Sequence, residues 1–198
     1  MKQLLGKYMT RLTSLSEAEQ QVILDEILVE TYGKGTVLLR QGEIPRKCYF
    51  VLEGCVRQYA IDVTGREVTS SFYTEEQGIS IFNGHKTDKS SEYTLTCLED
   101  SVLVVGLPNT EREMYAKYTQ LETMTRRMIE ENFGQVQEEF AAFIASTPEE
   151  RLKTLLRQRP GLISRVPQHQ LASYLGMTPE SLSRIKKRIQ WEHAAPEL

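Results

Sequence analysis

Short apolar runs alternate with polar positions and glycines between Thr31 and Val105. The runs are about four to seven residues long and are rich in Val, Leu, Tyr, Thr and Phe. Strands of this length, with turns at this frequency, indicate an antiparallel barrel or sandwich and not a parallel sheet. The glycines that punctuate the runs are Gly33, Gly35, Gly42, Gly54, Gly65, Gly78 and Gly84.

The pattern becomes helical after Pro108, and one long helix is predicted from Thr110 to about Ala145 because no proline interrupts it. Two apolar stripes follow the helix at steps of three and four residues, which is typical of a coiled-coil seam shared by two copies. The alternative is a helix packed on its own domain, and the step from Met128 to Phe133 makes the seam imperfect. The residues predicted for dimerisation are Leu121, Met124, Met128, Phe133, Val136 and Phe140.

Two capping boxes mark the starts of further helices. Ser16 with Glu19 predicts a short amphipathic helix before the strands, and Thr147 with Glu150 predicts another after the long helix. Residues 159–161, Arg-Pro-Gly, end this second helix. The C-terminal module is therefore predicted to contain three helices, beginning at about Thr147. The side chains of the first helix that are predicted to face inward are Leu152, Leu155 and Leu156.

Residues 168–189 predict two short helices around a tight turn. Pro167 opens the first helix at a position where its missing N–H costs nothing, and Gly176 ends that helix. Thr178 is the N-cap candidate of the second helix. This spacing is the helix-turn-helix pattern, and the alternative is an ordinary helical hairpin with a solvated charged face. The predicted inward residues are Leu171, Ala172, Leu175, Leu182, Ile185 and Ile189.

The outer face of the second helix is polar and cationic, with Glu180, Ser183, Arg184 and Lys187 at helical spacing. Residues 151–190 contain nine basic residues and a single acid, so this segment has a net charge of +8. The rest of the chain has −11, because the whole chain has −3. A sequence pI of about 5.8 thus conceals a basic module, which favours a polyanionic partner and salt-dependent binding.

The composition is that of an ordinary globular protein. The chain has 198 residues, of which 40% are hydrophobic and 26% are charged. The N-terminal residues contain no apolar run of the length of a signal peptide, and the most apolar stretch, residues 102–105, is too short to span a bilayer. The sequence therefore predicts a cytoplasmic protein without a membrane segment.

Neither the cysteines nor the histidines are spaced as metal ligands. Cys48, Cys55 and Cys97 fall in predicted strands and are interpreted as small strand or core residues, because three scattered thiols do not supply the usual iron–sulfur site. No metal or cofactor is predicted. The histidines are His85, His169 and His193.

Four segments are similar to one known family. Residues 35–43 (GTVLLRQGE) and 49–57 (YFVLEGCVR) are similar to the opening strands of a cyclic-nucleotide-binding domain, and residues 98–101 (LEDS) to a late strand. Residues 180–184 (ESLSR) are similar to the E-x-x-S-R recognition-helix signature of the Fnr branch. With the order of its elements, the chain resembles the Crp/Fnr family of bacterial transcription regulators over essentially its entire length.

The pattern and the resemblance together predict an α+β fold. An antiparallel β-roll of the cyclic-nucleotide-binding type, a double-stranded β-helix, is expected at 1–109 as the effector domain. A dimerisation helix is expected at 110–146, and a helix-turn-helix domain without a clear β-wing at 147–198. The resemblance implies four partners: a double-stranded DNA operator, a second copy of the chain, RNA polymerase and a small-molecule effector of unknown identity.

The chain departs from the family at the phosphate site. Its cyclic-nucleotide binders use an F-G-E helix and a later arginine, because phosphate needs oriented N–H groups and a guanidinium. Counting back from residues 98–101 places Ser91 and Glu92 at the arginine and the next position, and F-G-E is missing from residues 77–85. Cyclic AMP or GMP bound in the usual mode is therefore not expected. Lys86 or Lys89 would have to substitute, and the alternative is that both are solvated loop charges.

The sequence predicts a homodimeric, sequence-specific DNA-binding transcription regulator that is not an enzyme and that reads an inverted repeat. Arg184 is expected to contact guanine, Glu180 to accept from cytosine or to orient Arg184, and Lys187 to contact phosphate. One alternative is a ligand-sensing module acting through protein partners, which leaves the +8 segment unexplained. A cupin-type enzyme would need several histidines among the strands, where His85 stands alone. The residues predicted to contact DNA are Thr178, Glu180, Ser181, Ser183, Arg184, Lys187 and Arg188.

Overall fold

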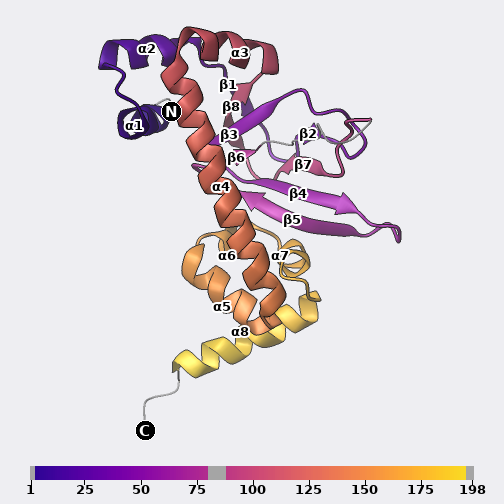
Figure 1. Ribbon diagram of the computed structural model, residues 1–198. Coiled ribbons are helices and arrows are strands. Elements are labelled where there is room, and N and C mark those ends of the chain that lie inside the picture. The colour runs from indigo at the N-terminus through magenta and orange to yellow at the C-terminus, as the bar shows by residue number, and fades with distance from the viewer. Residues whose placement is uncertain (1–2, 80–87, 195–198) are drawn as a thin grey trace. The chain divides into compact units, whose positions relative to one another are not determined.

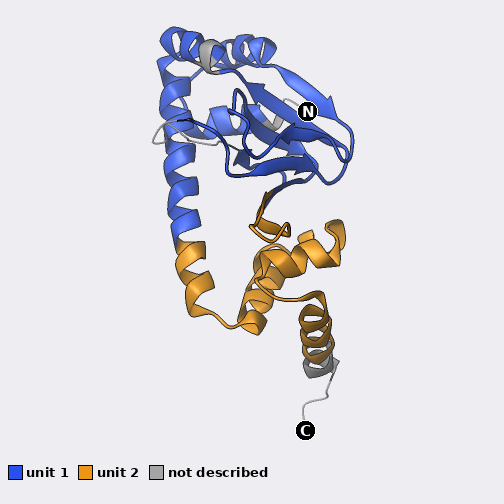
Figure 2. Cartoon of the chain, turned by 90° about the vertical axis from the view of Figure 1, so that its right-hand side faces the viewer, with its two compact units in different colours: residues 1–58, 72–137 blue, residues 59–71, 138–198 orange. Residues whose placement is uncertain are grey.

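The structure is a computed structural model that describes residues 3–79 and 88–194 (Figure 1). The chain forms two compact units (Figure 2). The first contains Met1–Gln58 and Phe72–Gln137, and the second contains Tyr59–Ser71 and Glu138–Leu198. The hairpin that includes Tyr59–Ser71 is thus grouped with the C-terminal helices.

In residues 3–79 and 88–194, eight strands form two four-stranded sheets that do not close into a barrel. This confirms the antiparallel β-roll predicted from the sequence. One sheet has the order β1-β8-β3-β6 and the other the order β2-β7-β4-β5. In the first sheet β8 lies antiparallel between β1 and β3, with Val104 opposite both Val29 and Phe50. The strands are β1 (Val29–Tyr32), β2 (Val37–Leu39), β3 (Cys48–Glu53), β4 (Val56–Ile61), β5 (Glu67–Tyr73), β6 (Gly78–Ile79), β7 (Thr94–Cys97) and β8 (Ser101–Gly106).

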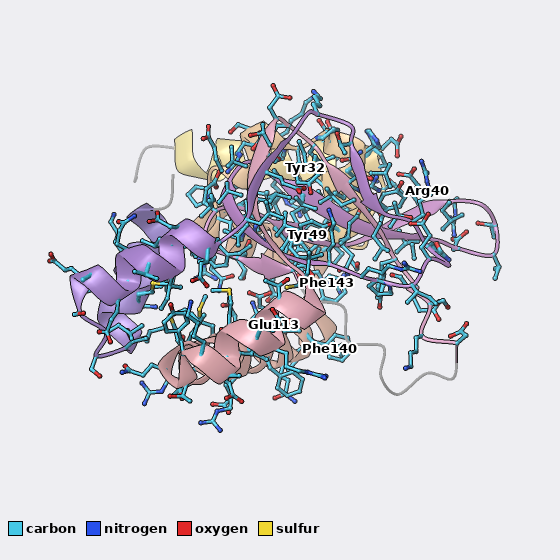
Figure 3. The ribbon with its side chains drawn as sticks, turned by 90° about the horizontal axis from the view of Figure 1, so that it is seen from above. Tyr32, Arg40, Tyr49, Glu113, Phe140 and Phe143 are labelled. Atoms are coloured by element: carbon cyan, nitrogen blue, oxygen red, sulfur yellow. The ribbon has the colours of Figure 1, made fainter. Side chains whose placement is uncertain are left out.

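Alternating residues of β3 and β8 enter two different apolar clusters, because successive side chains of a strand point to opposite faces. One face, with Val51 and Leu103, joins residues of the other sheet in the interior of the roll. Tyr49 of this cluster packs edge-to-face against Tyr32, with ring centroids 6.3 Å apart (Figure 3). Burial raises the pKa of Tyr49 to about 12.

The opposite face of the same strands, with Phe50 and Val104, joins a cluster formed by helices. These helices are α1 (Gln3–Leu12), α2 (Glu17–Glu26), α3 (Pro108–Lys117) and the start of α4 (Thr119–Ala145). They lie together at one end of the first unit (Figure 1). Since both faces of β3 and β8 are covered, their sequences are nearly continuous apolar runs rather than an alternation of apolar and polar residues.

Two features of this helical layer differ from the sequence prediction. Helix α1 was not predicted. The single helix expected from Thr110 is two helices, which Tyr118 separates with a non-helical backbone (φ −129°, ψ 83°). Residues of α3 and of α4 both pack on the same apolar cluster. A straight helix would carry one of them away from that cluster, so tertiary packing explains a break that neither proline nor glycine marks.

Both predicted capping boxes are present. The Ser16 hydroxyl accepts from the N–H of Glu19 at the start of α2, and the Glu19 carboxylate accepts from the N–H of Ser16. Thr147 and Glu150 make the same reciprocal pair at the start of α5 (Pro148–Gln158). Each pair satisfies N–H groups that have no partner within a helix.

The second unit differs from its prediction in three details. Its described part contains four helices beyond α4 instead of three, because a one-turn helix, α6 (Leu162–Arg165), precedes α7 (Gln168–Tyr174). Helix α8 (Pro179–Ala194) continues past Gln190, and the described residues contain no strand after it. Leu156, predicted to face inward, is 37% exposed, whereas Leu152 and Leu155 are buried.

Gly54, in the turn between β3 and β4, is a position where only glycine fits. Its φ is +110°, and a Cβ built on it would lie 2.7 Å from the Cα of Ser101. We expect Gly54→Ala to lower the free energy of unfolding by about 3 kcal/mol, through backbone strain and overpacking together. The measurement is urea denaturation. Gly65→Ala is the matched control, because Gly65 has φ +81° and open space around it, and equal losses for the two variants would contradict the steric argument.

Candidate nucleic-acid interface

The turn between α7 and α8 is closed by two backbone hydrogen bonds around Gly176. Gly176 has φ +69°, its N–H donates to the carbonyl of Ser173, and the N–H of Met177 donates to the carbonyl of Ala172, both at 3.0 Å. This arrangement is a Schellman motif, in which the left-handed residue is usually glycine. The predicted role of Gly176 is confirmed, and Pro167 is the N-cap residue of α7.

The first turn of α8 is fixed by Thr178. Its hydroxyl oxygen accepts from the N–H of Ser181 at 3.2 Å, which confirms the predicted N-cap. The N–H of Glu180 and the hydroxyl of Thr178 hold the pKa of the Glu180 carboxyl below its usual value. Glu180 therefore stays ionised at neutral pH and remains a hydrogen-bond acceptor at the N-terminal end of the helix.

One side of each of the two helices is buried in the second unit. Leu171 and Ala172 of α7 and Leu182 of α8 have no exposed surface, and Ile189 is 5% exposed. Ile185 is half-buried. Close packing of small and branched side chains holds α8 at a fixed angle to α7, so the orientation of α8 depends on its apolar face.

The predicted DNA-contacting residues occupy the free side of this helix pair. Thr178, Glu180, Arg184, Lys187 and Arg188 are exposed, and the two serines, Ser181 and Ser183, are half-buried. One guanidinium nitrogen of Arg184 donates to the hydroxyl of Ser181 at 3.3 Å, which leaves other N–H groups of the same fork available. The burial pattern brings these seven residues onto one accessible stretch of chain.

Arg188 is engaged in an ion pair within the second unit. Its guanidinium forms an ion pair with Glu149 of α5, whose other carboxylate oxygen lies 2.8 Å from Nζ of Lys153. The hydrogen bond from Lys153, and the charges of both cations, hold the pKa of Glu149 below its usual value. The sequence analysis missed this pairing, since 39 residues separate Glu149 from Arg188.

A second contact that the sequence analysis missed ties α7 to strand β5, within the second unit. The N–H of Thr69 donates to the hydroxyl oxygen of Ser173 at 3.0 Å, and the Ser173 hydroxyl lies 3.3 Å from the carbonyl oxygen of Glu67, to which it donates. Strand β5 is at the edge of its sheet. Ser173 therefore links α7 to the backbone of this edge strand.

The six residues predicted for dimerisation fall into two groups along α4. Leu121 and Met124 are buried in the helical cluster of the first unit, and Met128 is partly buried against it. For these three, the alternative of packing on the chain's own domain is the one observed. The other three are exposed, at 61%, 53% and 65%: Phe133, Val136 and Phe140 (the last labelled in Figure 3).

When Ile129 takes the place of Met128 in the predicted seam, the irregular step to Phe133 disappears. Ile129 is 43% exposed and precedes Phe133 by four residues. Ile129, Phe133, Val136 and Phe140, which are four of the exposed apolar residues of α4, therefore follow one another at steps of four, three and four. This is the spacing of a coiled-coil seam. We call these residues the α4 stripe: Ile129, Phe133, Val136 and Phe140.

The phosphate-site prediction is only partly covered by the described residues. Ser91 is 2% exposed, and its hydroxyl donates to the carbonyl of Tyr93 and accepts from the N–H of Tyr93. It therefore holds its own turn together. His85 and Lys86, with the rest of residues 80–87, lie outside the described residues.

None of the three cysteines, all of which lie in the described residues, forms a disulfide: Cys55 and Cys97 are buried and Cys48 is half-buried. Burial raises the pKa of the Cys97 thiol. In residues 3–79 and 88–194 no group of three or more His, Cys, Asp or Glu side chains is arranged to hold a metal ion. None of the helices within these ranges combines the length and the apolar character that crossing a bilayer requires.

A two-sheet roll, a long helix and a helix-turn-helix follow one another in this order along the chain. Residues 29–115 match the family model of the cyclic nucleotide-binding domain. The nitrogen fixation regulation protein FixK of Rhizobium meliloti (strain 1021) is 27% identical over 169 residues, which are 82% of this chain and 75% of FixK. The chain is homologous to the Crp/Fnr transcription regulators.

Solved structures show the same fold. FixK2 from Bradyrhizobium japonicum superposes with a TM-score of 0.69 at 16% identity, covering 86% of this chain and 88% of that one. A structure described as a transcriptional regulator of the Crp/Fnr family, from Eubacterium rectale, gives a TM-score of 0.67 at 16% identity, covering 97% and 91%. At these identities the likeness concerns the fold alone.

Proposed function

We propose that this protein is a homodimeric, sequence-specific DNA-binding transcription regulator, and that helix α8 enters the major groove. The observation that carries the proposal is the division of α8 into two sides. Leu182 and Ile189 are buried on one side, and the other presents exposed Arg184 and Lys187. A helix held by its apolar face with a cationic face free has the geometry that groove reading requires.

The proposed contacts follow from the donors and acceptors of each side chain. Arg184 donates two hydrogen bonds to the O6 and N7 of a guanine, and ionised Glu180 accepts from the amino group of a cytosine or orients Arg184. Ser181 and Ser183 reach a base edge or a phosphate. Lys187 contacts a phosphate, which adds affinity without sequence information.

The proposed dimer places two copies of α4 side by side along the α4 stripe. Four exposed apolar residues at coiled-coil spacing support it, because an apolar stripe of this kind is covered when a second copy pairs with it. A twofold dimer presents two α8 helices about one turn of DNA, roughly 34 Å, apart. The proposed operator is therefore an inverted repeat.

The sensor domain is proposed to act without a cyclic nucleotide bound in the family's usual mode, because Ser91 and Glu92 stand at the arginine and the following position and a carboxylate repels phosphate. Its effector is proposed to be another small molecule, which would shift the dimer between two states. We propose no catalytic role. As a partner of genomic DNA the protein would act in the cytoplasm, with RNA polymerase as the further partner that the Crp/Fnr resemblance implies.

The test is a gel shift with sheared genomic DNA at 50 and 200 mM salt, about a fourfold range, followed by sequencing of the bound fragments. We expect enriched fragments that share an inverted repeat, and an affinity that falls steeply with salt because bound phosphates release counterions. Enrichment of no common sequence, with binding equal to that of competitor DNA, would overturn the proposal. In that case the remaining hypothesis is a ligand-sensing module that acts through protein partners.

A further inference from the structure

Arg151, on helix α5, joins three segments of the second unit. Its Nε donates to the carbonyl of Phe143 at 3.1 Å, and its Nη1 donates to the carbonyl of Leu175 at 3.1 Å. Its guanidinium carbon lies 3.7 Å from the centroid of the Phe143 ring. One side chain therefore contacts both the last turn of α4 and the turn of the helix-turn-helix.

Each of the two carbonyls lies at the C-terminal end of a helix. Phe143 is among the last four residues of α4, and Leu175 is the C-cap residue of α7. Carbonyls at these positions have no partner within their own helix and carry the negative end of the helix dipole. A guanidinium satisfies both with charge-assisted hydrogen bonds, and its flat face stacks on the aromatic ring.

Gly176 leaves room for this arrangement. A Cβ built on Gly176 would lie 2.9 Å from Nη1 of Arg151 and 3.2 Å from the end of the Phe143 ring. Because Gly176 has no side chain, the turn between α7 and α8 can lie this close to the end of α4. Arg151 occupies the space at that approach and ties the two segments together.

We infer that Arg151 is a positioning residue that fixes the helix-turn-helix relative to the last turn of α4, and so sets the distance between the two half-sites that the dimer reads. The inference rests on the proposed function, because a spacing exists only when α4 pairs with a second copy. Arg151 itself needs no contact with DNA for this role. Its loss should therefore affect the geometry of the pair of recognition helices and not the reading of one half-site.

The variants are Arg151→Lys and Arg151→Gln. Lysine keeps the charge but replaces the planar fork by one ammonium nitrogen, which has no flat face to stack on the Phe143 ring, and glutamine tests the neutral case. The matched control is Arg157→Ala, which removes an exposed cation from the same helix. The Arg157 guanidinium donates to the Thr154 hydroxyl at 3.3 Å. Thermal unfolding of each variant shows that the protein measured is folded.

The experiment measures the affinity of each protein for a series of inverted repeats whose central spacer varies by single base pairs, and for one half-site alone. We expect wild type and Arg157→Ala to prefer one spacer over its neighbours by about tenfold, since a displaced half-site loses base contacts. We expect the two Arg151 variants to differ by less than about threefold across the series, while their half-site affinity stays within about twofold of wild type.

Two results would overturn the inference and they are distinguishable. If Arg151→Lys or Arg151→Gln retained the spacer optimum of wild type, the role of Arg151 would be refuted while the proposed function stood. If wild type itself showed no preference among spacers, the homodimeric function would fail, and the inference with it.

Discussion

Replacing Arg184 by alanine is expected to relax the base preference at one position of each half-site and to leave the other positions unaltered. A bidentate contact between a guanidinium and guanine contributes roughly 1–3 kcal/mol of discrimination, so the preference at that position should fall by about 5- to 150-fold. The measurement is a randomised-site selection followed by affinity determination for the four bases at each position. Arg184 is exposed, so its loss should not alter folding.

Lys187→Ala is the matched control for this result, since it removes an exposed cation one turn further along the same helix. We expect it to weaken binding to all sequences about equally and to reduce the salt dependence by about one released ion. An unchanged preference profile for Arg184→Ala would refute its assignment as the base-reading residue, whatever the effect on affinity.

Replacing Phe140 by glutamate is expected to convert the dimer into a monomer. Phe140 is 65% exposed in the single chain and lies in the α4 stripe, so the variant places two carboxylates in the proposed interface. Burying a polar group without a partner costs roughly 2–7 kcal/mol, and even about 3 kcal/mol raises the dimer dissociation constant more than 100-fold. Sedimentation analysis measures the association, and affinity for the full inverted repeat should fall with it.

Val22→Glu provides the comparison for this variant. Val22 is 48% exposed on α2, away from the α4 stripe in sequence, and the same apolar-to-acid change there should leave sedimentation unchanged. A Phe140→Glu protein that sediments as a dimer at the concentrations at which wild type does would exclude the stripe as the interface.

Local signals in the sequence were sufficient to predict several elements. Ser16 with Glu19, and Thr147 with Glu150, start helices because their reciprocal hydrogen bonds involve only four consecutive residues. Gly176 ends α7 because a left-handed residue closes the turn locally. The β-roll was predictable for a related reason, since strand length and turn spacing are read along the chain.

Helix α1 shows a signal that was present but not used. Leu5, Tyr8, Met9 and Leu12 follow one another at helical spacing, and all four pack in the helical cluster of the first unit. The break at Tyr118 had no such signal, because nothing in the sequence there stops a helix and only packing on a shared cluster explains it.

The features of the candidate site also include some that local sequence signals predict and others that they do not. The exposed face of α8 was predictable from periodicity, since burial of Leu182 and Ile189 determines which residues remain outside. The partners of Arg151 and Arg188 were not, because charge and spacing do not reveal which distant carboxylate or carbonyl a long side chain reaches. For α4, the pattern predicted an apolar stripe but not which part of it packs on the chain's own domain. In the structure this packing ends near Met128.

The ion pair between Glu149 and Arg188 has a consequence for how the C-terminal charge should be counted. A guanidinium already paired with a carboxylate neutralises phosphate less effectively, so it releases fewer of the counterions condensed on a duplex. The number of cations released from the nucleic acid should therefore be smaller than the number expected from the formal excess of arginine and lysine in this region. In the proposed complex with DNA, Glu149 would compete with the phosphodiester backbone for Arg188, and this competition would weaken sequence-independent attachment.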